Sequence, residues 1–152
     1  MTDISIRAFR KGIRALEREV ELALLSQTEC CGVTPAQCHL LLAVEDAGEP
    51  SVGELATQLE LDASTLSRTV NGLVNAGLLA RREDPANRRR QLVSLTEAGT
   101  ERANAINASC DGYYEGLLSS LPETESRAVA NALPVFVKAM REWRHGGNGC
   151  KR

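Results

Sequence analysis

The stretch from residue 52 to residue 96 constrains the fold of this chain more than any other part of its sequence. Apolar residues recur at helical spacing over residues 51–61, and again from residue 62 or 63 to residue 76. Gly77 suits the C-terminus of the second helix. This stretch therefore begins with two short helices that are closely spaced along the chain.

A basic hairpin is expected directly after these helices. Residues 78–82 and 91–95 resemble short strands, and they flank the polar loop DPANRRR, so they pair best with each other. We expect Arg88, Arg89 and Arg90 at the tip of this hairpin. Two short helices followed by a basic hairpin predict a winged helix-turn-helix.

Composition places the whole chain in a mainly helical class, with the small hairpin as its β structure. The 152 residues fit one domain, and 43% of them are hydrophobic but only 3% aromatic, which favours helices packed through Leu, Val, Ile and Ala. The net charge of -2 argues against a protein that coats nucleic acid through bulk positive charge. The arginines gathered over residues 81–90 instead predict one basic surface.

The regions before and after this stretch are predicted to be long amphipathic helices. The first should end near residue 27, before a cysteine-bearing loop at 28–33, and a second should begin after the N-cap Thr34 and reach about residue 46. Residues 96–119 predict a further helix, and a last one follows the break at 121–123. The first and last helices have apolar stripes: Ile6, Phe9, Ile13, Leu16, Val20 and Ala23 in the first; Val129, Leu133, Phe136, Met140 and Trp143 in the last.

These two stripes have two interpretations. They pack on the body of the same chain, or they form the interface of a helical dimer, which we favour because a dimer places two DNA-binding heads on one duplex. Pro134 lies within the last helix and is expected to kink it.

The polar face of the second short helix is the main candidate for reading DNA. Its buried stripe is Leu66, Val70, Leu73 and Val74, which leaves short hydrogen-bonding side chains and one arginine on the other side. Such side chains suit base edges and phosphates in the major groove. The predicted contacts are Ser64, Thr65, Ser67, Arg68 and Asn71.

The hairpin arginines are the second candidate. Charge runs are often only solvated surface, but three adjacent arginines on a tight hairpin concentrate positive charge where a narrow minor groove is most negative. We therefore assign Arg88, Arg89 and Arg90 to the minor groove or to phosphates. The sequence also permits an ion pair between Asp84 and Arg89 across the loop.

The segment resembles the MarR family of bacterial transcription regulators. The resemblance rests on LATQLELDASTLSRTVNGLVNAGLLARREDPANRRRQLVSLTEAG, and the order of helices extends it over nearly the whole chain. Asn87 departs from the aspartate that many members have before the wing arginines. The resemblance implies a single domain over residues 1–152, with a DNA-binding lobe at 34–96 and a dimerisation region at 1–27 and 97–146. It also implies a homodimer on a pseudopalindromic operator in double-stranded DNA, usually acting as a repressor that an effector releases.

The cysteines are candidates for sensing that effector. Cys30, Cys31, Cys38 and Cys110 fall in the region where many members bind their effectors, and the resemblance extends to members that sense oxidants or zinc. Thiolates favour zinc, cadmium, mercury, lead or trivalent arsenic, whereas a low-pKa thiol favours oxidation. Cys38 also lies on an apolar stripe, so these cysteines have a purely structural interpretation too.

Other functional classes fit the sequence less well. It contains no C-x-x-C, no glycine-rich phosphate loop, no G-x-S-x-G and no HExxH, so no enzyme is expected. Two alternatives stay open: a winged-helix module for protein interaction or metal buffering that does not read DNA, and a MarR-like regulator of a small organic ligand.

The sequence also predicts where the protein works. Its N-terminus is charged and lacks the features of a secretory signal, and no segment approaches the roughly 20 apolar residues of a membrane span. We expect a cytoplasmic protein with no membrane partner, in which the five cysteines are kept as thiols.

Overall fold

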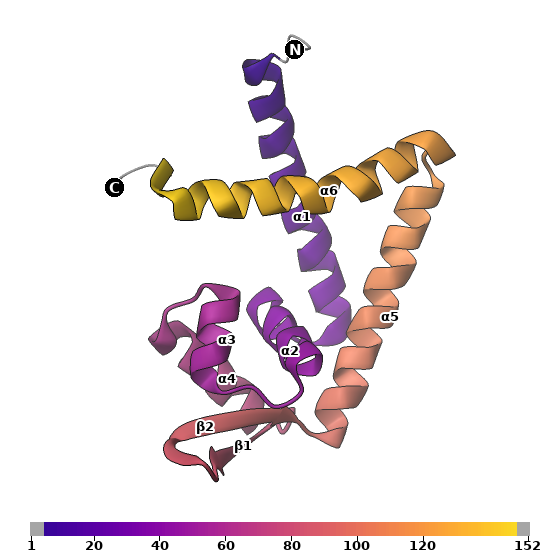
Figure 1. Ribbon diagram of the computed structural model, residues 1–152. Coiled ribbons are helices and arrows are strands. Elements are labelled where there is room, and N and C mark those ends of the chain that lie inside the picture. Colours follow the sequence, from indigo (N-terminus) through magenta and orange to yellow (C-terminus); the bar gives the residue numbers. More distant parts are fainter. Residues whose placement is uncertain (1–4, 149–152) are drawn as a thin grey trace. The chain divides into compact units, whose positions relative to one another are not determined.

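The computed structural model of the protein describes residues 5–148, although the side chains of residues 26–31 and 147–148 lie outside what it describes. The chain divides into two compact units, Met1–Cys110 and Asp111–Arg152. Helices dominate the described part, and the two strands form one antiparallel hairpin (Figure 1), which confirms the predicted class. In chain order the elements are α1 (Ile6–Cys31), α2 (Pro35–Ala47), α3 (Val52–Leu59), α4 (Ala63–Asn75), β1 (Leu79–Asp84), β2 (Asn87–Leu95), α5 (Glu97–Ser119), α6 (Glu123–Trp143) and the short π-helical turn η1 (Arg144–Asn148).

Side-chain caps set the beginnings of the three short helices. Thr34 and Gln37 form the predicted capping box at α2, and Ser51 and Glu54 form a second one at α3. Asp62 caps α4 by accepting a hydrogen bond from the backbone of the third residue of that helix. Because each cap satisfies backbone N–H groups that have no partner inside the helix, the starts of these helices are specified locally.

Helix α1 is longer than predicted. It runs to Cys31 instead of ending near residue 27, so the prediction of a loop at residues 28–33 is wrong for most of its length. Gly32, which has a φ of 64°, follows the last helical residue, and glycine adopts this left-handed conformation without a steric penalty. The backbone of Cys30 and Cys31 therefore belongs to the last turn of α1, while their side chains lie outside the described part.

The hairpin is longer than predicted, and its arginines do not lie at its tip. Strand β2 begins at Asn87, so Arg88, Arg89 and Arg90 are strand residues and the turn consists of Pro85 and Ala86. The pairing passes from Glu83 opposite Gln91 directly to Asp84 opposite Asn87. The three arginines thus lie in an irregular bulge without Cα partners on β1, which is where a strand bends and re-aims its side chains.

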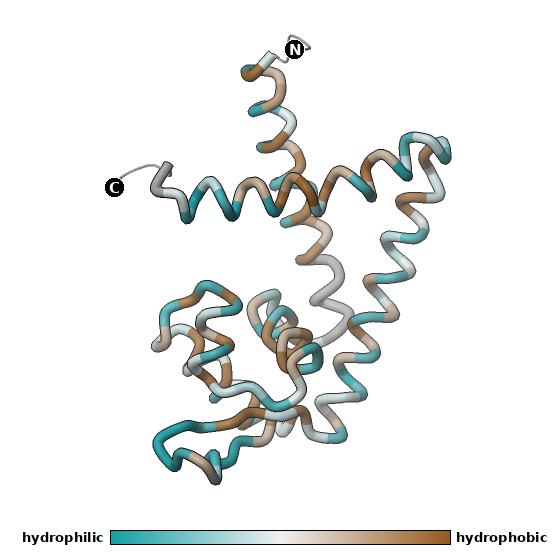
Figure 2. The backbone as a smooth tube through the Cα atoms, viewed as in Figure 1, coloured by the Kyte–Doolittle hydropathy of each residue, from teal (hydrophilic) through white to brown (hydrophobic). Residues whose placement is uncertain are grey.

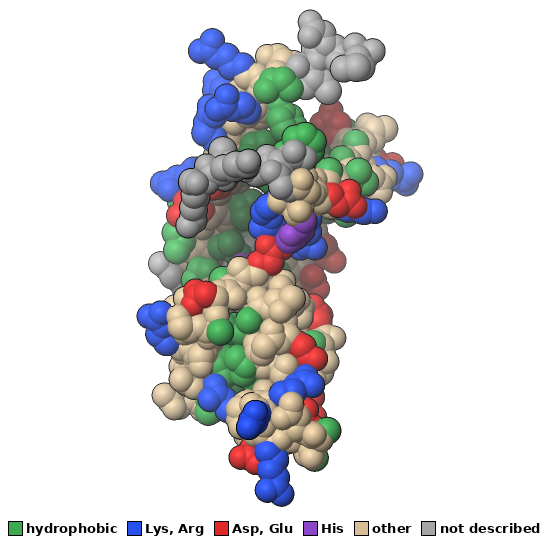
Figure 3. All heavy atoms as spheres, turned by 60° about the vertical axis from the view of Figure 1, so that its left-hand side comes forward, with side chains coloured by type: hydrophobic (Ala, Val, Ile, Leu, Met, Phe, Trp, Pro, Cys, Tyr) green, Lys and Arg blue, Asp and Glu red, His purple; other side chains and the backbone are tan. Residues whose placement is uncertain are grey.

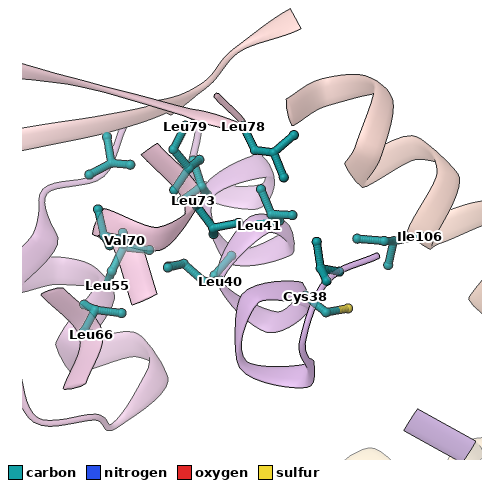
Figure 4. Close-up of a cluster of buried hydrophobic side chains, with 14 residues drawn as sticks. Cys38, Leu40, Leu41, Leu55, Leu66, Val70, Leu73, Leu78, Leu79 and Ile106 are labelled. Carbon is teal, nitrogen blue, oxygen red and sulfur yellow. The ribbon is translucent and has the colours of Figure 1, made fainter. Parts of the chain in front are cut away.

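The core of the first unit joins α2, α3, α4 and the base of the hairpin (Figure 4). Leu40, Leu41, Leu55, Leu66, Val70, Leu73 and Val93 are completely buried in it. Ile106 of α5 belongs to the same cluster. Gly99 permits a close approach nearby, since a Cβ there would lie 1.9 Å from the carbonyl oxygen of Leu78.

The long helices α1 and α6 are amphipathic, but their apolar residues are not buried. Helix α6 has no buried residue, and it continues through Pro134; the expected kink stays a prediction. Figure 2 shows apolar and polar residues alternating along both helices. The exposed apolar residues include Ile6, Phe9, Leu16 and Val20 of α1 and Val129, Leu133, Met140 and Trp143 of α6. Within residues 5–148 we find no helix that is both long and apolar enough to span a membrane.

Candidate nucleic-acid interface

Helix α4 has one face buried and the other open to solvent. Leu66, Val70 and Leu73 are completely buried, which fixes the rotation of the helix about its axis. As a result, Ser64, Thr65, Arg68 and Asn71 are exposed, and Ser67 is half-buried at the edge of the face. The polar face predicted from the sequence is thus a surface of the folded protein, while its contact with DNA stays a prediction.

The N-terminus of α4 is held by an ionised carboxylate. Asp62 Oδ1 accepts hydrogen bonds from Ser64 Oγ at 2.5 Å and from the backbone N–H of Thr65 at 2.8 Å. The Ser64 hydroxyl, followed by the Thr65 side chain and backbone, holds the pKa of Asp62 well below its usual range. The Ser64 hydroxyl donates within the protein, so it remains an acceptor toward a ligand.

Two of the hairpin arginines are paired with carboxylates. Arg82 binds both oxygens of Glu49, at 2.6 Å through Nε and 2.5 Å through Nη2, and this hydrogen bonding lowers the pKa of Glu49. Arg90 lies 2.9 Å from Glu54 and 3.7 Å from Asp84. The ion pair expected between Asp84 and Arg89 is wrong: Asp84 pairs with Arg90 instead, next to the irregularity in the pairing of β1 with β2.

Arg88 and Arg89 keep their charge available. Both are exposed, and neither forms an ion pair with a described carboxylate. Figure 3 shows Lys and Arg side chains at the lower end of the view, where the hairpin lies. Of the three arginines predicted as a unit, two therefore present unneutralised charge and the third is tied to α3.

A hollow of about 590 Å³ opens between the hairpin and the polar sides of α3 and α4. Arg81, Arg89, Arg90 and Ser67 line it, together with the beginning of α3 at Ser51. Positively charged and hydroxyl side chains thus share one concave surface with the carboxylate of Glu54, which pairs with Arg90. Such a surface fits a phosphate backbone lying against both the helix and the hairpin.

One contact in this surface was missed by the sequence analysis. Arg81 of β1 donates through Nη2 to Asn71 Oδ1 of α4 at 2.9 Å. The signal was present in the alternation of β1: Leu79 and Arg81 lie two residues apart and face the same side, and Leu79 is buried. The alternation alone names no partner, however, because that depends on how the hairpin packs on α4.

The predicted effector cysteines are only partly described. Cys38 of α2 is 6% exposed within the core, and Cys110 of α5 is half-buried against the same cluster. Figure 4 shows Cys38 at the edge of the cluster nearest Ile106. Among the side chains that the structure describes, no three His, Cys, Asp or Glu residues are grouped to hold a metal ion. A site that includes Cys30 or Cys31 lies beyond this observation.

Comparison with known proteins relates this surface to regulators of transcription. The family model described as "MarR family" matches residues 32–90. The chain is 28% identical over 139 residues to the HTH-type transcriptional repressor MdtR of Bacillus subtilis (strain 168), covering 91% of this chain and 86% of MdtR. It is 31% identical over 100 residues to the HTH-type transcriptional regulator YxaD of the same organism, covering 66% of this chain and 70% of YxaD. Across five such relatives, the alignments span 61% to 86% of the relatives' own lengths.

Solved structures show the same fold. The MarR family transcription regulator SP03579 superposes with a TM-score of 0.82 at 21% identity, covering 92% of this chain and 93% of that one. A mutant of S. aureus MepR bound to an oligodeoxyribonucleotide superposes with a TM-score of 0.62 at 21% identity, covering 87% of this chain and 97% of that one. These relatives are regulators and not enzymes, and the chain belongs to the MarR family of DNA-binding transcription regulators.

Proposed function

We propose that two copies of this chain form a repressor that binds a pseudopalindromic operator and releases it when an effector binds. The observation that carries the proposal is the outward polar face of α4 beside the arginine-bearing hairpin. Because burial of Leu66, Val70 and Leu73 fixes the rotation of α4, Arg68 and Asn71 cannot turn inward without opening the core. The face is therefore preorganised for a ligand.

The two elements suit different parts of a duplex. Helix α4 presents short polar side chains, which suit base edges in the major groove. Arg88 and Arg89 carry unneutralised charge on a narrow hairpin, which suits the minor groove or its phosphates. The hollow lined by Ser67, Arg81 and Arg89 lies between them and fits the phosphate backbone that separates the two grooves.

The exposed apolar stripes favour two copies over one. Helix α6 leaves Leu133 and Trp143 52% and 65% exposed, and α1 leaves Ile6 and Leu16 exposed. An apolar stripe left exposed along a helix in this way favours an interaction site. A symmetric dimer covers these stripes and presents two α4 helices, whose spacing must match half-sites about one helical turn apart.

Binding to fluorescently labelled promoter DNA, followed by anisotropy, tests the proposal. Arg68→Ala should weaken binding by about fivefold or more if Arg68 meets a base in the complex, since such contacts contribute about 1–3 kcal/mol each. The matched control is Arg127→Ala, which removes an exposed arginine from α6, where it pairs with Glu123. Equal affinity of both variants would remove Arg68 from the interface, and no binding of promoter DNA by the wild type would favour the alternative of a winged-helix module that does not read DNA.

For the effector, we propose a thiophilic metal ion or metalloid bound by some of Cys30, Cys31, Cys38 and Cys110, with zinc, cadmium, mercury, lead and trivalent arsenic as candidates. Support comes from Cys38 and Cys110, which lie in or against the same core cluster although they belong to different helices. A ligand joining these thiols would change how α2 and α5 pack and, through α2, the position of α4. Soft sulfur donors favour such ions over calcium or magnesium.

Titration of the protein–DNA complex with arsenite, cadmium, zinc or peroxide, under otherwise anaerobic conditions, separates the effector hypotheses. Release by a metal or metalloid that Cys38→Ser or Cys110→Ser abolishes supports the proposal. Release by peroxide alone would make the protein a redox switch. Indifference to all four would leave the cysteines structural and point to a small organic ligand.

A further inference from the structure

The hydrogen bond between Arg81 and Asn71 determines which end of the Asn71 side chain is presented to a ligand. A guanidinium group has only donors, whereas a carboxamide has an oxygen acceptor at one end and an amino donor at the other. Arg81 Nη2 can therefore bind only Oδ1 of Asn71, at 2.9 Å. The Nδ2 group of Asn71 must then be directed away from Arg81.

The packing of the hairpin on α4 maintains this arrangement. Arg81 lies opposite Val93 in the antiparallel register, so the two side chains lie on the same face of the hairpin. Val93 is completely buried, and Leu79, two residues before Arg81, is buried on that same face. Arg81 thus extends from the side of β1 that packs toward α4. Arg82, on the opposite face, binds Glu49 instead.

The bond also leaves the positive charge of Arg81 uncompensated. Its partner is a neutral amide, and no ion pair joins Arg81 to a carboxylate among the described residues. In contrast, Arg82 is paired with Glu49, and Arg90 is paired with both Glu54 and Asp84. At the Asn71 position, the exposed surface therefore combines amide donors with an unneutralised guanidinium.

We propose that Arg81 is a specificity-determining residue that makes Asn71 select a guanine and reject an adenine in each half-site. This inference rests on the proposed reading of DNA by α4. An asparagine that recognises adenine needs both ends, since Oδ1 accepts from N6 while Nδ2 donates to N7. Here Arg81 takes one of the two lone pairs of Oδ1, and its positive charge beside that oxygen opposes the amino group of adenine at the other. Guanine presents two acceptors, O6 and N7, which match the remaining donors.

Selection of bound sequences from a library randomised over the promoter site tests this inference. Wild-type protein should enrich guanine at one position in each half-site. Arg81→Met keeps the aliphatic stem but removes every donor, and we expect it to shift the ratio of guanine to adenine at that position by about tenfold. Asn71→Ala should flatten the preference at the same position, and Arg81→Lys should restore much of it because an ammonium group also donates to Oδ1.

The matched control is Arg82→Met, which removes the neighbouring guanidinium and its pair with Glu49. It should weaken binding to all sequences alike and leave the base preferences unchanged. An Arg81→Met protein with wild-type preferences and only uniformly weaker binding would overturn the inference, since Arg81 would then act only on phosphates. If the wild-type protein itself enriched no sequence, the proposed reading of an operator would fail first, and the inference with it.

Discussion

Helices α4 and α6 are both amphipathic, yet only α4 has its apolar stripe buried within the chain. In α4, Leu66, Val70 and Leu73 are completely buried against α2, α3 and the hairpin. In α6, the corresponding stripe leaves Leu133 and Trp143 more than half exposed, and no residue of the helix is buried. The same periodic pattern thus has two different outcomes in one molecule.

The difference separates the role of folding from the role of assembly. Helix α4 obtains its stability from tertiary contacts in its own chain, so its polar face is fixed before any partner arrives. An isolated helix gains little stability from propensity alone, and most helical stability in proteins comes from packing of the apolar face. Helix α6 has no buried residue, and we propose that a second copy of the chain covers its apolar stripe.

The largest effect is expected from Leu133→Arg, which places a charge in the exposed stripe of α6. If that stripe is a dimer interface, the variant should sediment as a monomer and bind the operator about a hundredfold more weakly or worse, because linking two binding heads contributes roughly 10²–10⁴ in avidity. Analytical ultracentrifugation and anisotropy measure the two effects on the same sample.

Lys138→Ala is the control for this change. Lys138 is exposed on α6 and lies 3.8 Å from Glu142, so its removal leaves the apolar stripe unchanged. It should sediment and bind DNA like the wild type. A Leu133→Arg protein that stays dimeric would refute the comparison, since the stripe of α6 would then be covered in some other way.

Leu66→Ala tests the other half of the comparison. Its side chain is completely buried, and removing it should lower the free energy of unfolding by about 2–5 kcal/mol. Urea denaturation of the Leu133→Arg background measures this loss without a contribution from assembly. In that background, Val129→Ala on α6 should change the midpoint little, because Val129 is half exposed. Similar losses for both variants would show that α6 is buried after all.

The sequence was informative where structure depends on neighbours along the chain. The Thr34 cap, the stripe of α4 and the break before Glu123 all follow from residues within one or two helical turns, and the structure has each of them. The end of α1 was misjudged because no helix-breaking residue precedes Gly32. The predicted loop began at Thr28, which does not by itself end a helix.

The site was predicted in outline and missed in its connections. The exposed face of α4 follows from the helical period alone. The place of Arg90 does not, because it depends on a bulge in β2 and on a carboxylate of α3 that is distant in the sequence. Likewise, the bond from Arg81 to Asn71 exists only because the hairpin packs on α4 through Leu79 and Val93. Pairings of this kind are set by tertiary structure.

Arg89→Ala should weaken DNA binding without changing assembly. Mutations in the apolar stripe of α6, in contrast, should change assembly first. Because Arg89 is exposed and has no ion pair with a described carboxylate, its charge is available to phosphates. Its loss should reduce the slope of log affinity against log salt by roughly 0.9 for each phosphate contact removed. Arg141→Ala, on α6, should leave the slope unchanged. An unchanged slope for Arg89→Ala would remove Arg89 from the interface.

The smallest effect concerns acid stability and distinguishes how the two helices begin. Asp62 caps α4 as a carboxylate, whereas the N-cap of α6 is Pro122, which makes no side-chain cap hydrogen bond. The hydrogen bonds from Ser64 and Thr65 lower the pKa of Asp62 in the folded protein. The contribution of Asp62 to stability is therefore present above the ordinary Asp pKa of about 4 and is lost as the pH falls below it.

Asn is also a good N-cap but does not titrate, so Asp62→Asn should match the wild type near neutral pH and lose less stability in acid. Urea denaturation of both proteins between about pH 7 and pH 3 measures the difference in stability. Glu49 and Glu54 are present in both proteins, so their titration cancels in the comparison. Parallel curves would mean that Asp62 keeps its proton affinity on folding, and that the cap of α4 is no more sensitive to acid than the uncapped start of α6.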